Sequence, residues 1–152
     1  MEAIAATGAG FLLAVLWFDL MFDVQARGHG DDELPESVLV SIANYYRRVT
    51  TDARPMNLLV GTAMGATLAT VVVELATGDA ATWAAWASLG LVAIAILVAT
   101  THTVPNAVRL GGRADTTTDQ SALARSILRQ HQVIFVLMAV TIALQIASAV
   151  SS

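Results

Sequence analysis

The sequence lacks cysteine and lysine, and it is poor in charge of either sign. Only 13% of its 152 residues are charged, whereas about a quarter is usual in a soluble domain. The formal net charge is −4, and all eight basic residues are arginines. The absence of cysteine excludes disulfides, thiolate nucleophiles and Cys-ligated metal clusters. A net acidic chain without a basic run also gives no reason to expect nucleic acid as a partner.

What the chain has instead is long hydrophobic runs, and 56% of its residues are hydrophobic. Four apolar segments cover about residues 3–22, 55–77, 80–103 and 133–150, each close to the roughly 20 residues that a helix needs to cross a bilayer. We therefore predict an all-α integral membrane four-helix bundle, a single transmembrane domain over residues 1–152, with the lipid bilayer as its first partner. The first segment has no positive flank, so we interpret it as a retained span rather than a signal peptide.

The arginines indicate an orientation. Four spans place both termini on one side, and residues 23–54 and 104–132 form the two long loops on the other. These loops hold every arginine: Arg27, Arg47, Arg48, Arg54, Arg109, Arg113, Arg125 and Arg129. Because positive residues are enriched in cytoplasmic loops, both long loops are predicted to be cytoplasmic and both termini to lie outside.

The first loop contains a further helical pattern over about residues 35–49. Pro35 suits a first helical turn, apolar residues then recur near helical spacing, and Arg47 and Arg48 close the run. This pattern predicts an amphipathic helix in the cytoplasmic membrane interface, with Tyr45 and Tyr46 at headgroup depth. The alternative is a helix that covers the mouth of the bundle as a lid.

Polar residues gather at the cytoplasmic ends of the spans. Asp19 lies between Phe18 and Leu20 in an apolar run, and Asp23 shares its helical face. A carboxylate in hydrocarbon is costly, so Asp19 should face the bundle and have a partner such as Arg54, Arg109 or His102. Either a structural ion pair or a functional pocket satisfies this requirement. Asn57 belongs to the same polar set, where it could instead satisfy backbone donors at a helix start.

The stretch "THTVPNAVR" places His102, Asn106 and Arg109 on one helical stripe. Pro105 removes a backbone hydrogen bond beside it. We predict that the stripe faces the bundle, meets the aspartates and His131, and forms one polar pocket beneath the 35–49 helix. The alternative is a set of separate surface ion pairs without a cavity.

Two cofactor alternatives use the same histidines. His102 and His131, on adjacent helices at similar depth, could be the axial ligands of a haem b. A metal bound by Asp19, Asp23, His102 and His131 is chemically admissible, but the sequence has no diagnostic ligand spacing, and we predict no metal site.

Within the spans, Gly61 and Gly65 form a G-x-x-x-G pattern, which permits close helix approach inside the bundle or in a homo-oligomer. Glu74 is expected to extend toward water at the outer end of its span, and Gln145 to hydrogen-bond another helix.

The chain resembles the anthrone oxygenase-like family of small four-span membrane proteins. The resemblance lies in "TTHTVPNAVRL" at the end of the third span, in the acidic end of the first span with "YYRR", and in the histidine of "RQHQVIF". It implies oxidation of a hydrophobic small molecule without an obvious cofactor.

Residue chemistry can support such an oxidation. His102 or His131 would act as the base, Asn106 or Arg109 would stabilise an oxyanion, and Asp19 would orient the histidine. A haem-binding protein and a non-catalytic accessory subunit of a membrane complex remain the alternatives.

Overall fold

The computed structural model describes residues 2–30, 32–78 and 82–151, with the side chains of all but residues 2, 54–57, 82 and 151. The described residues form helices and connecting segments, with no strand among them. The long helices are α1 (Glu2–Asp23), α3 (Arg54–Thr77), α4 (Thr82–Val98) and α6 (Thr117–Ser151). The shorter ones are η1 (Val24–Ala26), α2 (Glu36–Arg47), η2 (Arg48–Asp52), η3 (Ala99–Thr103) and α5 (Val104–Gly112). The all-α prediction is confirmed.

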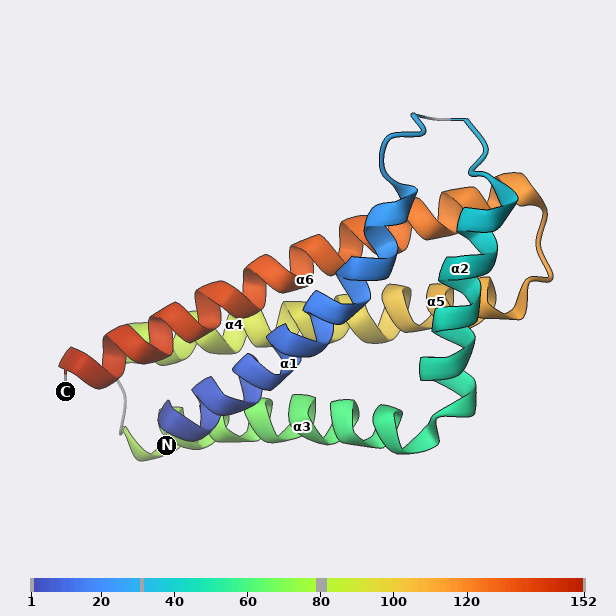
Figure 1. The fold of residues 1–152 in the computed structure, drawn as a ribbon. Coiled ribbons are helices and arrows are strands. Elements are labelled where there is room, and N and C mark those ends of the chain that lie inside the picture. Colours follow the sequence, from blue (N-terminus) through green and yellow to red (C-terminus); the bar gives the residue numbers. More distant parts are fainter. Residues whose placement is uncertain (1, 31, 79–81, 152) are drawn as a thin grey trace.

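The long helices run along one general direction (Figure 1). Both chain ends lie at one end of the molecule, and α2 stands across the other. Among the described residues, four stretches are long and apolar enough to cross a membrane: Ala3–Ala26, Leu58–Thr77, Trp83–Gly112 and Thr117–Val150. The third is longer than the sequence predicted, because helix continues past Pro105, and α6 begins well before its apolar run.

The outer surface carries large apolar side chains on every long helix. Trp17, Leu58, Trp83, Leu97 and Val136 are each between 59% and 73% exposed. Soluble monomers rarely present apolar surface on this scale. This exposure agrees with helices that are long and apolar enough to cross a membrane.

The middle of the bundle is closed by small and aliphatic side chains. Leu12, Leu16, Val92, Ile134 and Met138 form its buried cluster with Ala9 and Ala95. The close approach of α1 to α3 depends on Gly8, since a β-carbon there would lie 2.2 Å from the Thr67 hydroxyl oxygen.

A helix is present where the first loop predicts one. α2 begins after Pro35 and buries Leu39, Ile42, Ala43 and Tyr46, and its cluster includes Leu110 of α5 and Ile127 of α6. Its apolar face is therefore used against protein, which agrees with the lid alternative. The approach of α2 to α5 depends on Gly111, because a β-carbon there would lie 2.8 Å from the Arg47 backbone nitrogen.

Contacts between α2, its leading segment and the α5–α6 region hold this helix across the bundle end. The Leu34 amide donates to the Ser121 hydroxyl at 2.9 Å. Arg113 pairs with Glu36, and Thr118 donates to Glu33. These bonds attach the start of α2 and the segment just before it to the end of α5 and the start of α6.

One wide helical turn, η3, interrupts the third span. It is a π-helical turn that ends immediately before Val104, so Pro105 follows it closely. The turn inserts residues into the helical repeat and rotates everything beyond it. The buried positions are Val92 and Ala95 before the turn, and Thr103, Ala107 and Leu110 from it onward. Wide turns of this kind occur often at functional sites.

Candidate functional site

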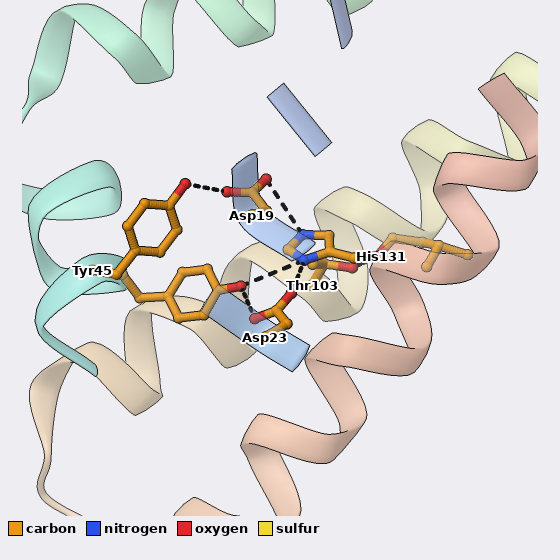
Figure 2. Close-up of polar contacts among 7 residues, drawn as sticks. Asp19, Asp23, Tyr45, Thr103 and His131 are labelled. Atoms are coloured by element: carbon orange, nitrogen blue, oxygen red, sulfur yellow. Dashed lines mark hydrogen bonds and ion pairs between the residues drawn. The ribbon is translucent and has the colours of Figure 1, made fainter. Parts of the chain in front are cut away.

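Two aspartates of α1 form the base of a buried polar cluster at the α2 end of the bundle (Figure 2). Asp19 and Asp23 are one turn apart and point the same way, as their spacing predicts. Asp23 is fully buried, and the Asp19 side chain is 15% exposed. The prediction that Asp19 has a partner inside the bundle is confirmed; among the partners named for it, His102 and Arg109 are exposed instead, and the Arg54 side chain lies outside the described residues.

Consecutive tyrosines of α2 donate to the two carboxylates. The Tyr45 hydroxyl lies 2.7 Å from Asp19 Oδ1, and the Tyr46 hydroxyl lies 2.5 Å from Asp23 Oδ1. Tyr45 also stacks on Phe22, with 4.0 Å between ring centroids. Sequence reasoning placed both tyrosines at headgroup depth, which stays a prediction, and it did not foresee these contacts, which follow because α2 turns its apolar face toward the bundle.

Burial raises the pKa of the Tyr45 phenol, and the neighbouring Asp19 charge raises it further. Burial likewise raises the pKa of Tyr46, with the Asp23 charge as the next cause. Both environments disfavour a phenolate. The two tyrosines therefore remain hydrogen-bond donors at every physiological pH.

His131 of α6 joins the two aspartates. Its Nδ1 lies 2.7 Å from Asp23 Oδ2, and its Nε2 lies 3.8 Å from Asp19 Oδ2. Because an ionised carboxylate only accepts hydrogen bonds, the proton on Nδ1 is donated to Asp23. When the ring is neutral, this arrangement leaves its lone pair on Nε2, on the Asp19 side. This is how an aspartate orients a histidine that acts as a base.

Two cavities meet at this histidine. One of about 130 Å³ extends into the middle of the bundle between Leu12, Met64 and Met138. The other, of about 350 Å³, lies under α2 and is lined by Tyr45 and Tyr46. Both are lined by Asp19, Thr103 and His131. The prediction of one polar pocket beneath the 35–49 region is supported for Asp19 and His131.

The predicted stripe of α5 does not take part. His102 and Arg109 are exposed and Asn106 is half-buried, and none of the three is among the described residues that line the two cavities. The expectation that they point into the bundle is wrong for the exposed His102 and Arg109. They do share a stripe, but the η3 turn moves the inward face by one position, so Thr103 lies inside where α-helical spacing placed His102.

Arg109 has a partner of its own on the surface. Its Nε and one terminal nitrogen each lie 2.8 Å from an oxygen of Asp115. This bidentate pair uses the guanidinium that sequence reasoning assigned to an oxyanion. The side chains of Arg54 and Asn57, two further members of the predicted polar set, lie outside the described residues.

The η3 turn also separates the two histidines that the haem alternative requires. His131 contacts a carboxylate through each ring nitrogen, while His102 faces outward. In the described part of the chain, no three His, Asp or Glu side chains are placed to hold a metal ion.

A second polar group lies deep in the other half of the bundle. Glu74 is fully buried, and the Gln145 amide lies 3.2 Å from its Oε2 and 3.1 Å from the Ser88 hydroxyl. The expectation that Glu74 extends toward water is therefore wrong, whereas the prediction that Gln145 bonds another helix is confirmed. The group joins α3, α4 and α6.

The G-x-x-x-G pattern lies on the outside of α3. Gly61 and Gly65 are exposed, and a β-carbon at either would meet nothing within 4 Å. The pattern does not serve packing inside the bundle. A contact between copies of the chain through these glycines remains a prediction.

Sequence reasoning missed the roles of three side chains: Tyr45, Tyr46 and Thr103. Adjacent residues on a helix point about 100° apart, and the two aspartates lie one turn apart on α1. The pair of neighbouring tyrosines was therefore a signal in the sequence that each could reach one aspartate. Thr103 had none, because only the wide turn brings it inside.

Comparison of the chain with protein-family models, with curated proteins and with solved structures found no match.

Proposed function

We propose that the chain is a four-span integral membrane protein that binds and oxidises a hydrophobic small molecule at the Asp19–His131 site. The observation that carries this proposal is the contact of His131 with Asp23 at 2.7 Å, at the point where the two cavities meet. The smaller, apolar cavity is called the slot. The bias of arginines toward the α2 end supports a cytoplasmic position for this site and external termini. α2 then lies at the cytoplasmic membrane interface.

The histidine acts as a general base. Nε2 of the neutral ring takes a proton from an activated C–H or O–H group of the substrate, and Asp23 stabilises the imidazolium that forms. The hydroxyl of Tyr46 holds the other oxygen of Asp23, which fixes the orientation of this pair. Tyr45 does the same for Asp19.

The substrate anion must form beside two carboxylates, which is unfavourable unless positive charge accompanies it. The imidazolium of His131 provides that charge. A tight ion pair of substrate anion and imidazolium is therefore the expected intermediate, without the oxyanion role given to Asn106 and Arg109 from the sequence.

The family resemblance implies that the anion is then oxidised by dioxygen. In an anthrone-like substrate, a ring CH₂ loses both hydrogens and becomes a carbonyl. One atom of O₂ forms the new C=O bond, and the other leaves as water. The four electrons lost by carbon are those gained by dioxygen, and the protein contributes proton transfer and exclusion of water.

The test is oxygen uptake by purified protein in lipid nanodiscs with anthrone as the probe. His131→Gln should lower the rate about 10²- to 10⁴-fold, the usual contribution of a general base. His102→Gln, an exposed histidine on the third span, is the matched control and should leave the rate unchanged. Wild-type activity retained in His131→Gln would contradict the proposal, and no oxygen uptake by the wild-type protein would favour a non-catalytic accessory role.

The same preparations test the haem alternative. A Soret band in the wild-type protein that is lost in both histidine variants would favour haem bound by His102 and His131 over a base acting on an organic substrate.

A further inference from the structure

The two cavities at the site differ in the chemistry of their walls. The larger one contains Asp19, Thr50, Thr103 and His131 together with four aromatic rings, those of Phe18, Phe22, Tyr45 and Tyr46. Beyond their shared region, the smaller one has only apolar side chains. A ligand that fills both must therefore have a polar end and an apolar end, with the junction at His131.

The larger cavity selects the polar end. Both tyrosine hydroxyls already donate to carboxylates, and the two threonine hydroxyls of this cavity donate to backbone carbonyls. The groups that remain toward a ligand are therefore acceptors: the Asp19 oxygens and His131 Nε2. An anionic head would be repelled by these carboxylates, whereas a hydroxyl can donate to them. The aromatic walls favour a flat ring, which stacks on their faces. A hydroxyl on an aromatic ring meets both conditions.

The smaller cavity selects the apolar end. Its volume of about 130 Å³ is close to that of apolar protein cavities that accept a single benzene-sized group. Leu12 and Met138 lie seven residues beyond Asp19 and His131, so the slot extends roughly 10 Å along the helices. A slot of this length and width fits one hydrocarbon tail.

The entrance is on the side of the bundle. Val104 lines both cavities and is 51% exposed, and the half-buried Val60 lines both as well. These two residues lie on η3–α5 and on α3, at the bundle end that the first loop covers. A ligand can therefore enter between them from the hydrocarbon without passing through water.

We infer that the ligand of this site is a single-tailed hydroxyarene, a phenol or quinol with one alkyl or isoprenoid chain, taken laterally from the bilayer. This inference rests on the proposed function, because it names the substrate class of the same site. The hydroxyl donates to Asp19 or His131, the ring lies among the aromatic walls, and the tail fills the slot toward Met138.

The test uses 4-alkylphenols that carry a diazirine at the end of the tail, photolysed with the protein in nanodiscs at equal amounts per lipid. Short tails should label the slot near His131, at Ala99 and Ile134, and tails of about 10 Å should label it near Leu12 and Met138. Met138→Trp should lower labelling by the long-tailed probe about tenfold, equivalent to about 1.4 kcal/mol. Met64→Trp, which fills the slot from a less buried position, gives a second variant should the first fail to fold.

Val136→Trp is the matched control, since Val136 is 59% exposed on the same helix, and it should leave slot labelling unchanged. Labelling confined to outward residues such as Val136 and Leu97, equal in all variants, would overturn the inference. Stronger slot labelling by the same tail on a trimethylammonium head would overturn the hydroxyarene assignment in favour of a cation.

The outcomes separate this inference from the proposed function. Slot labelling without oxygen uptake would leave the ligand class standing and contradict the oxidation. Oxygen uptake without slot labelling would support the oxidation and contradict the assignment of the ligand class.

Discussion

The two tyrosines offer an internally controlled test of the site, because they are neighbours with the same chemistry and different surroundings. Tyr46→Phe removes the hydroxyl that donates to Asp23 at 2.5 Å. Tyr45→Phe removes the hydroxyl that donates to Asp19 at 2.7 Å. Each substitution deletes one oxygen and keeps the ring, so packing changes little and the hydrogen bond is isolated.

The expected magnitudes follow from what can replace each donor. Asp23 is fully buried, so its Oδ1 is left without the phenol, and a hydrogen bond to a charged group contributes about 1.5–3 kcal/mol. The Asp19 side chain is 15% exposed and lines the larger cavity, where water can take the place of the phenol. We expect its loss to cost about 0.5–1 kcal/mol, close to a neutral bond.

The assay is unfolding in mild detergent or nanodiscs, followed by loss of helical circular dichroism. Tyr46→Phe should lower the free energy of unfolding by about 0.5–2.5 kcal/mol more than Tyr45→Phe. It should also lower the turnover, since Asp23 then holds His131 less firmly. Equal destabilisation, or a larger effect at Tyr45, would refute the assignment of Asp23 as the buried anchor of the cluster.

Three further predictions use the same structure. Tyr45 and Tyr46 are the only tyrosines and both pKa values are raised, so tyrosinate absorbance should stay absent in the folded protein at pH 10–11, where free tyrosine titrates. The stability they contribute is full below the unfolded pKa of about 10 and is lost as pH rises above it; titration near pH 10 while folded would contradict their burial. Gly111→Ala should destabilise the protein by about 1–3 kcal/mol, because the added β-carbon meets the Arg47 backbone. The control is Gly112→Ala, whose β-carbon meets nothing within 4 Å and which should not destabilise the protein. Equal unfolding temperatures of the two variants would show that α2 does not dock as described. Ser37→Cys and Thr77→Cys, each the single thiol of an otherwise cysteine-free chain, should react with an impermeant maleimide from the cytoplasmic and the external side respectively, and the reverse pattern would invert the proposed topology.

The helical architecture could be predicted from the sequence because it depends on length and hydropathy alone. A run of about 20 apolar residues can satisfy its backbone in hydrocarbon only as a helix or a closed barrel, and these four runs lack the alternation of a barrel strand. The burial of Asp19 followed from the same cost. Glu74 shows the limit of that reasoning. It is held by Gln145 of α6, which also bonds Ser88 of α4, and the sequence did not indicate which faces of these helices meet α3.

The division of the polar residues between inside and outside depended on helix phase, which the sequence indicates only while the repeat is regular. His102, Asn106 and Arg109 follow Ala95 and Ala99 at α-helical spacing, and a regular helix would have carried all of them toward His131. One π turn at Ala99–Thr103 was enough to bring Thr103 inside instead. The hydroxyl now lies where a second histidine would have lain, so the site holds one imidazole between two carboxylates. That composition favours a single base with a fixed tautomer over a pair of metal or haem ligands, and the wide turn before Pro105 is therefore the local feature on which the chemistry of this site depends.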